Sequence, residues 1–211
     1  MAVDSRGNQR YGVVIVKTEG VQPIPVDIQG ATLSLDADGG LAVNSKSYRS
    51  TVSITRPSNT TTYTAGDVIG VADSGTPANA GSAIHTLTNA GPSGGFILLQ
   101  SAALLFSDAA VIANMAGFRV HLFSSSPGAV LDNAAFDLTA GDRAAYMGFF
   151  ELPTPIDLGS TIYTQTDSIG RMVKLAASST SLFAEIETRG GYQPASGSTI
   201  ELRINAMEVG L

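Results

Sequence analysis

Cysteine and tryptophan are both absent from this sequence of 211 residues, and histidine occurs only twice. Without cysteine the chain can form neither disulfides nor thiolate metal sites. Aromatic residues make up only 7% of the chain, which leaves little material for the aromatic-lined cleft that holds a sugar in a glycoside hydrolase. The inventory of residue types therefore gives little support to catalysis or to carbohydrate binding.

Charge is also scarce. Charged residues account for 14% of the chain, whereas an ordinary soluble domain has about 25%. The net charge of −6 makes nucleic acid an improbable partner, because an acidic protein gains nothing from counterion release. A surface poor in charge and rich in small residues suits a protein whose surface is covered by other subunits.

Long apolar runs are missing as well. The longest apolar stretches, Gly12–Val16 and Ala102–Phe106, are far too short to span a bilayer. No signal peptide is visible, because the polar segment Met1–Arg10 is not followed by an apolar run with a cleavage site. We therefore expect a soluble protein that is made in a cytoplasm and has no membrane partner.

Residues 1–48 are predicted to form an extended N-terminal arm with short strands. Tyr11–Lys17 (YGVVIVK) is rich in β-branched residues, and the glycines and prolines that follow it interrupt any long element. One interpretation is a frayed terminus; the other is an arm that docks on a neighbouring subunit, because this run is too apolar to leave in water. The candidate docking residues are Tyr11, Val13, Val14, Ile15 and Val16.

Residues 49–211 are predicted to form an all-β domain. Short strand candidates separated by turn signals are typical of a sandwich or barrel. The clearest is Thr199–Ala206, in which Ile200, Leu202 and Ile204 alternate with polar residues. The other candidates are Ser50–Arg56, Asp67–Val71, Ala83–Leu87, Gly95–Gln100, Ala103–Phe106, Phe118–Phe123, Ala145–Phe150, Thr161–Thr164, Met172–Leu175 and Ser181–Thr188.

At most one or two short helices are expected. Ser107 and Asp108 are suitable caps for a helix over Ala109–Met115 that Gly117 would end. A second helical turn is predicted at Gly141–Ala145. Neither is long enough to change the fold class.

No catalytic residue, metal site or cofactor is predicted. The two histidines, His85 and His121, both lie in predicted strands, and the alternation around His121 places it on the face opposite Val120 and Leu122, at the surface or in an interface. Asp132, Asp137 and Asp142 supply the oxygen ligands that calcium prefers, but their spacing matches no compact loop that would wrap an ion. Both histidines are therefore interpreted as structural.

Residues 118–163 carry a resemblance. The run FRVHLF, the segment DNAAFDL, the turn GDR and the following aromatic strand resemble virion proteins of tailed bacteriophages. The segment Ser53–Gly70, SITRPSNTTTYTAGDVIG, is similar to another stretch of such proteins. The resemblance covers roughly residues 50–211, more weakly the arm, and contains no catalytic motif.

The resemblance implies a capsid decoration (cement) protein with a jelly-roll-like β-sandwich. Such a protein would bind the outside of the major capsid protein lattice and stabilise it, and it would associate with itself, a trimer being favoured. The arm would then add a strand to a neighbour's sheet. The alternative is a tail-fibre or baseplate domain that binds a host receptor. An enzyme is the third hypothesis, and no feature of the sequence recommends it.

Overall fold

The computed structural model describes residues 2–3, 9–10 and 46–209. The chain divides into two compact units, residues 1–43 and 44–211. In the first unit, strands β1 (Ala2–Val3) and β2 (Gln9–Arg10) pair antiparallel. The predicted docking residues Tyr11, Val13, Val14, Ile15 and Val16 lie outside the described residues.

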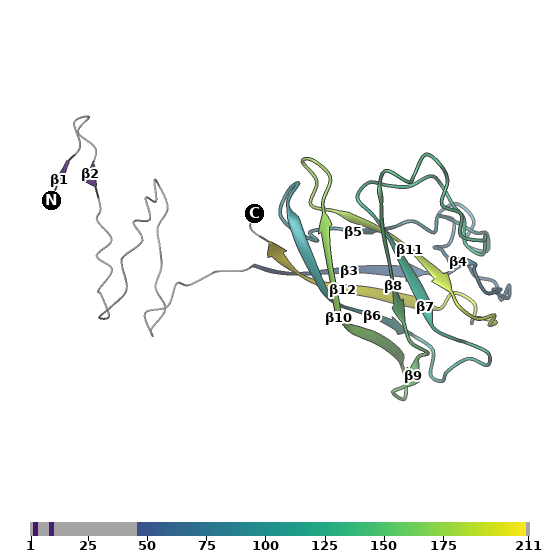
Figure 1. Cartoon of the computed structure of the whole chain (residues 1–211). Helices are drawn as coiled ribbons and strands as arrows, with labels where there is room; N and C mark the ends of the chain where they lie inside the picture. The colour runs from purple at the N-terminus through teal and green to yellow at the C-terminus, as the bar shows by residue number, and fades with distance from the viewer. Residues whose placement is uncertain (1, 4–8, 11–45, 210–211) are drawn as a thin grey trace. The chain divides into compact units, whose positions relative to one another are not determined.

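The second unit is a sandwich of two antiparallel sheets (Figure 1). The first sheet has the strand order β3-β12-β6-β10-β9, and the second has the order β4-β11-β7-β8, with β5 also paired to β11. The prediction of an all-β sandwich is thereby confirmed. The strands are β3 (Ser47–Thr55), β4 (Val68–Ile69), β5 (His85–Leu87), β6 (Phe96–Phe106), β7 (Phe118–Phe123), β8 (Tyr146–Leu152), β9 (Ile156–Asp157), β10 (Ile162–Lys174), β11 (Leu182–Thr188) and β12 (Thr199–Val209).

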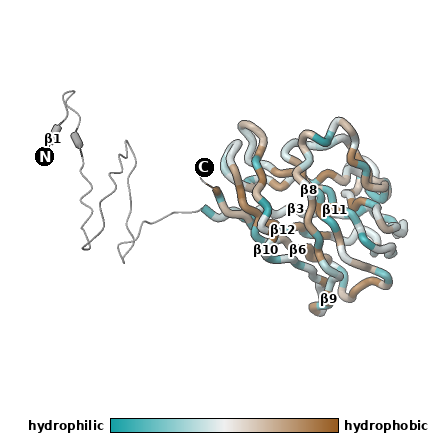
Figure 2. Tube along the Cα trace, viewed as in Figure 1, coloured by the Kyte–Doolittle hydropathy of each residue, from teal (hydrophilic) through white to brown (hydrophobic). Residues whose placement is uncertain are grey.

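Alternation along the strands builds the core between the sheets. In β12, Ile200, Leu202 and Ile204 are buried while the residues between them are partly exposed, as a strand with one buried face requires. The facing sheet contributes Val120 and Leu122 of β7, which are fully buried. Figure 2 shows this apolar character along the central strands of both sheets. Burying each such side chain stabilises the fold by roughly 1.5–3 kcal/mol.

Two strands are longer than the sequence indicated. The predicted strands Gly95–Gln100 and Ala103–Phe106 merge into the single strand β6, which begins at Phe96, and those over Thr161–Thr164 and Met172–Leu175 merge into β10, which runs from Ile162 to Lys174. The register of β10 against β6 shifts between Asp167 and Arg171. The bulge at this shift contains a residue with positive φ, Ser168, and explains why the sequence shows no continuous alternation there.

The predicted helix over Ala109–Met115 is wrong. The segment forms a turn in which the Met115 N–H donates to the Ile112 carbonyl, and Asn114 adopts a φ of 65° that a right-handed helix does not contain. Gly141–Ala145 is likewise a run of turns. No helix in residues 46–209 is long and apolar enough to cross a membrane.

Candidate functional site

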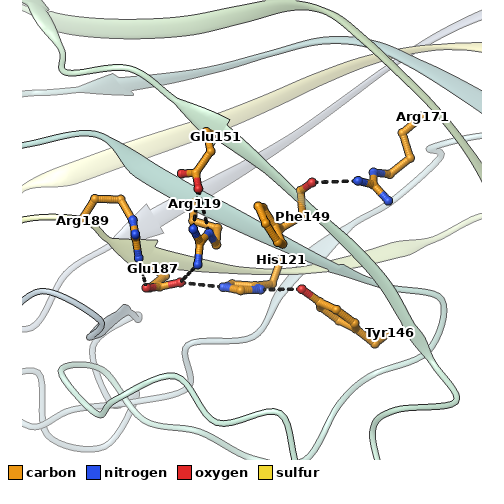
Figure 3. A network of polar contacts seen from close by, with 8 residues as sticks. All are labelled: Arg119, His121, Tyr146, Phe149, Glu151, Arg171, Glu187 and Arg189. Carbon is orange, nitrogen blue, oxygen red and sulfur yellow. Dashed lines mark hydrogen bonds and ion pairs between the residues drawn. The ribbon is translucent and has the colours of Figure 1, made fainter.

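The outer face of the second sheet carries a cluster of polar side chains in two cross-strand rows (Figure 3). Arg119 of β7 lies between Glu187 of β11 and Glu151 of β8 in one row. In the next row His121 lies between Glu185 and Phe149. Side chains directly opposite each other on one face of antiparallel strands are close enough to interact, so the pairing register itself assembles the cluster.

Glu187 is the centre of the first row. Its Oε2 lies 2.8 Å from His121 Nε2 and 3.5 Å from Arg119 Nη1, and its Oε1 lies 2.7 Å from Arg189 Nη1. Arg119 also binds Glu151 through Nη2 at 2.6 Å and Nε at 2.9 Å. Two guanidinium groups thus neutralise two carboxylates around one imidazole.

His121 is buried, with only 3% of its surface exposed. The prediction that alternation places it at the surface or in an interface is therefore wrong for the isolated chain. The residue does point to the face opposite Val120 and Leu122, but the segment after β7 folds over that face, and the Phe136 ring stacks on the imidazole with centroids 3.6 Å apart. The alternation of residues within a strand does not show whether a connection elsewhere in the chain covers one of its faces.

The contacts of His121 define its protonation state. Burial lowers its pKa below the ordinary value of 6.5, although the bond to Glu187 opposes this. Burial alone would raise the pKa of Glu187, but the bonds from His121 and Arg189 lower it. At neutral pH the neutral imidazole therefore donates its Nε2 hydrogen to the Glu187 carboxylate, and Nδ1 accepts from the Tyr146 hydroxyl 3.0 Å away.

Both ring nitrogens of His121 have hydrogen-bond partners inside the cluster. The Glu187 carboxylate occupies Nε2 of the imidazole and the Tyr146 hydroxyl occupies Nδ1. The outer rim is open: Phe149 is 39% exposed, and the Arg119 guanidinium lies 4.3 Å from the centre of its ring. Arginine and aromatic side chains of this kind dominate the energetics of protein interfaces.

A second cluster lies inside the fold around Arg56. The Arg56 Nε donates to the Tyr63 hydroxyl at 2.6 Å, and Nη2 lies 3.4 Å from Asp132 Oδ2. The other carboxylate oxygen of Asp132 accepts from the Tyr63 hydroxyl at 2.6 Å and from the Gly70 N–H at 2.7 Å. Arg56 and Asp132 are both buried, so this ion pair is a structural element of the interior.

The three aspartates considered as calcium ligands have separate roles. Asp132 belongs to the Arg56 cluster, whereas Asp142 caps a turn by accepting from the Gly128 N–H at 2.9 Å and from the Thr139 hydroxyl at 2.6 Å. Asp137 and Asp142 line a cavity of about 150 Å³ together with Glu185. No group of three His, Asp or Glu side chains in residues 46–209 is arranged to hold a metal ion.

Glu185 is an unusual member of the cavity wall. Its residue surface is only 3% exposed, and no hydrogen bond to its carboxyl group occurs within residues 46–209. Burial, reinforced by the charge of Asp142, raises its pKa to about 7. The other histidine, His85, is also buried. Its Nε2 lies 2.8 Å from the Ile69 carbonyl oxygen.

A polar groove of about 200 Å³ lies on the first sheet. It is lined by Arg49 of β3, Tyr163 and Gln165 of β10, and Arg203 and Asn205 of β12. Asn205 donates to the Ser101 hydroxyl at 3.0 Å, and Arg203 pairs with Glu201. The groove is shallow and hydrophilic, so its contribution to binding would come from hydrogen bonds more than from apolar burial.

Sequence reasoning missed most of these residues. The signal for the first cluster was present, because the predicted strands Phe118–Phe123 and Ser181–Thr188 each place two ionisable residues on one face. The register that joins Arg119 to Glu187 was not available from alternation alone. Alternation places Arg56 on the same face as Val52 and Ile54, but arginine is seldom fully buried, so its burial was not predicted.

Comparisons with known proteins give little support to any relationship. No protein-family model matches the chain, and no curated protein sequence matches it. Among solved structures, a chain of the infectious bursal disease virus Gx strain is 14% identical with a TM-score of 0.20, and a chain of the VP2 subviral particle of infectious bursal disease virus is 12% identical with a TM-score of 0.15. The matches cover 90% of this chain but only 45% and 46% of those chains. TM-scores of this size do not establish a shared fold.

Proposed function

We propose that the protein is a structural component of a virus particle, a decoration protein that packs on the outside of the major capsid protein lattice and stabilises it. The observation that carries the proposal is the order in which the strands pair. β3 pairs with β12, β4 and β5 with β11, β6 with β10, and β7 with β8. The first strand of the domain thus pairs with the last, and each following strand pairs with the next one inward from the end, apart from β9.

This nested pairing supports the jelly-roll interpretation. A long hairpin whose two arms are wound together into two sheets gives the orders β3-β12-β6-β10 and β4/β5-β11-β7-β8, with β9 as an addition at one edge. Jelly rolls of eight strands are common in viral capsid domains, and they also occur in lectins and cupins. Fold alone therefore does not decide the function, and the sequence resemblance of residues 118–163 to tailed-phage virion proteins favours the virion.

The surface of the domain is consistent with docking on other proteins. Ile156 and Leu158, at and beside β9, are 58% and 59% exposed, and Met172 on β10 is also exposed. Phe149 and Arg119 form the open rim of the polar cluster. Modest contacts of this kind suffice on a repeating lattice, because multivalent attachment multiplies their effect.

Binding to capsids that lack the protein tests the proposal. We expect the full chain to bind such capsids and to raise the temperature at which they rupture. Phe149→Ala should weaken binding without unfolding the domain, because Phe149 is 39% exposed and lies outside the core between the sheets. Deletion of residues 1–17 should abolish binding while the β domain stays folded. An arm-less protein that decorates capsids at full occupancy would overturn the role assigned to Tyr11 and Val13–Val16.

A second candidate function is recognition of a host receptor by a tail-fibre or baseplate domain. The groove lined by Arg49, Tyr163 and Arg203 favours it, since a polar hollow on a sheet face is a suitable place for a hydrophilic ligand. Copy number separates the two candidates. Hundreds of copies per particle support decoration, whereas a few to tens support a fibre.

A further inference from the structure

The four outer edges of the two sheets differ in how they are protected. An edge strand presents unpaired N–H and C=O groups that can pair with another chain, and proteins block such edges with bulges, short strands, charges or covering segments. Three of the four edges in residues 46–209 carry such a device. Within the same residues the fourth edge, β3, is covered only at the Thr55 carbonyl, and its only charge is that of Arg49.

The blocked edges are those of β10, β8 and the β4–β5 side. β10 is covered at Ile162 and Tyr163 by β9, and its register against β6 then shifts before Arg171. β8 has its carbonyl oxygens at Met147 and Phe149 capped by the Arg171 guanidinium, at 3.0 and 3.1 Å. Beside β11 the edge position is divided between two short strands, β4 and β5.

The edge of β3 is regular over nine residues. Its pairing with β12 runs from Ser47 to Thr55 without a register shift. The strand contains no proline, no lysine and no residue with positive φ. Its one charged residue is Arg49, whose exposed side chain lies on the outer face of the strand.

The direction of the backbone groups of β3 follows from its ends. The Lys46 carbonyl accepts from the Glu208 N–H of β12, and the Arg56 N–H donates to the Ser198 carbonyl before β12, so even-numbered residues point toward β12. The Thr55 carbonyl points the other way and accepts from the Ala72 N–H. Because neighbouring residues of a strand alternate, the N–H and C=O groups of Ser47, Arg49, Thr51 and Ser53 point out from the free edge.

We propose that the free edge of β3 pairs antiparallel with β3 of a second copy of this chain, centred on Ser50. This register pairs Ser47 with Ser53 and Arg49 with Thr51 of the other copy, and it leaves the Thr55 carbonyl to Ala72. All of these pairs are between residues whose backbone groups point outward, so each exchanges two hydrogen bonds. The inference rests on the proposed function only in naming one surface through which a virion subunit would assemble.

The side chains of β3 are compatible with a second copy on both faces of the strand. On the outer face, Arg49 meets Thr51, so no like charges are opposed. On the inner face, the half-buried Tyr48 and Val52 lie opposite each other across the two-fold axis and would cover each other. An edge that pairs with itself through a two-fold axis is fully used when two subunits have joined. We therefore expect an even number of subunits, in contrast to the trimer expected from the sequence.

Sedimentation equilibrium of the full chain and two opposite charge variants tests the inference. Thr51→Lys places a lysine opposite Arg49 of the other copy at two symmetric positions, whereas Thr51→Glu places a glutamate there. We expect the wild type to dimerise, Thr51→Lys to weaken the dimer and Thr51→Glu to retain it. The two dissociation constants should differ by about tenfold, and the difference should shrink at 1 M salt because exposed charges are screened.

Ser125→Lys, in the bend after β7, is the matched control, because it adds the same charge at an exposed position on the other sheet; it should leave the dissociation constant unchanged. Thermal unfolding of each variant shows that the domain is intact. A wild type that stays monomeric at about 0.5 mM, or equal effects of the lysine and glutamate at residue 51, would overturn the inference. A monomer that still decorates capsids would overturn it while leaving the proposed function in place.

Discussion

Gly148 lies directly beneath the guanidinium group of Arg171. Gly148 adopts a φ of +91°, and a Cβ atom there would overlap Arg171 Nη1. Arg171 reaches from β10 of the first sheet to the carbonyl oxygens of Met147 and Phe149 on β8 of the second sheet. One glycine and one arginine therefore join the two sheets at one side of the sandwich.

Gly148→Ala should destabilise the domain by about 1–3 kcal/mol, because it combines backbone strain with the displacement of Arg171. Gly159→Ala is the matched control: its φ is +100° but nothing lies within 4 Å of the added Cβ. Chemical denaturation measures both. The excess loss in Gly148→Ala reports the Arg171 contact, and equal losses would contradict it.

Replacement of Asp132 should strongly lower the stability of the domain. Asp132→Asn should destabilise the domain by about 3–5 kcal/mol, because it leaves the buried Arg56 guanidinium without its charge partner. Tyr63→Phe keeps the ion pair and removes only the hydroxyl that bonds both members, so its cost should be about 1–3 kcal/mol. Urea unfolding orders the two variants, and a larger loss in Tyr63→Phe would contradict the dominant role given to the ion pair.

His85 should make the domain sensitive to acid. Burial lowers its pKa from 6.5 to about 4, although the bond to the Ile69 carbonyl opposes the shift. The unfolded chain then binds the proton more tightly, so stability is lost as the pH falls from about 6.5 to 4, by up to about 1.4 kcal/mol per pH unit. His85→Gln should reduce this loss, as followed by thermal unfolding at a series of pH values. An unchanged pH profile would contradict the assignment.

Glu185 should make the domain less stable as the pH rises, whereas His85 makes it less stable as the pH falls. Its pKa in the folded chain, about 7, lies above the ordinary 4.5 because of burial and the charge of Asp142. The folded chain therefore binds the proton more tightly, and the stabilisation present below pH 4.5 is lost as the pH rises through 7. Glu185→Gln should be more stable than the wild type at pH 8 and equal to it near pH 4. Asp137→Asn, in the same cavity wall, controls for a general loss of acidic charge.

The sequence predicted the positions of the strands better than it predicted which segments pack against them. Period-two alternation located Phe118–Phe123 to the residue and Thr199–Ala206 within a longer strand, because one face of each is buried against the opposite sheet. It divided β10 into two strands, because the bulge before Arg171 interrupts the alternation. Alternation also missed the burial of His121, because the segment after β7 covers its face, and it gave no reason to expect a buried arginine at residue 56.

The candidate site was predictable only in part. The faces of β7 and β11 that carry Arg119 and Glu187 follow from alternation, but their cross-strand register depends on long-range pairing. The helix predicted over Ala109–Met115 failed for a related reason. Its caps were suitable, but Asn114 takes a left-handed conformation and Met115 is buried in the core instead.

Electron microscopy of purified virus particles, with and without this protein, tests whether the protein decorates a capsid. We expect a β-sandwich in hundreds of copies on the outer surface of the capsid, bound to the major capsid protein. We also expect an undecorated lattice that ruptures more readily when the protein is missing. Particles whose capsid lattice and stability are unchanged by its removal would contradict the account.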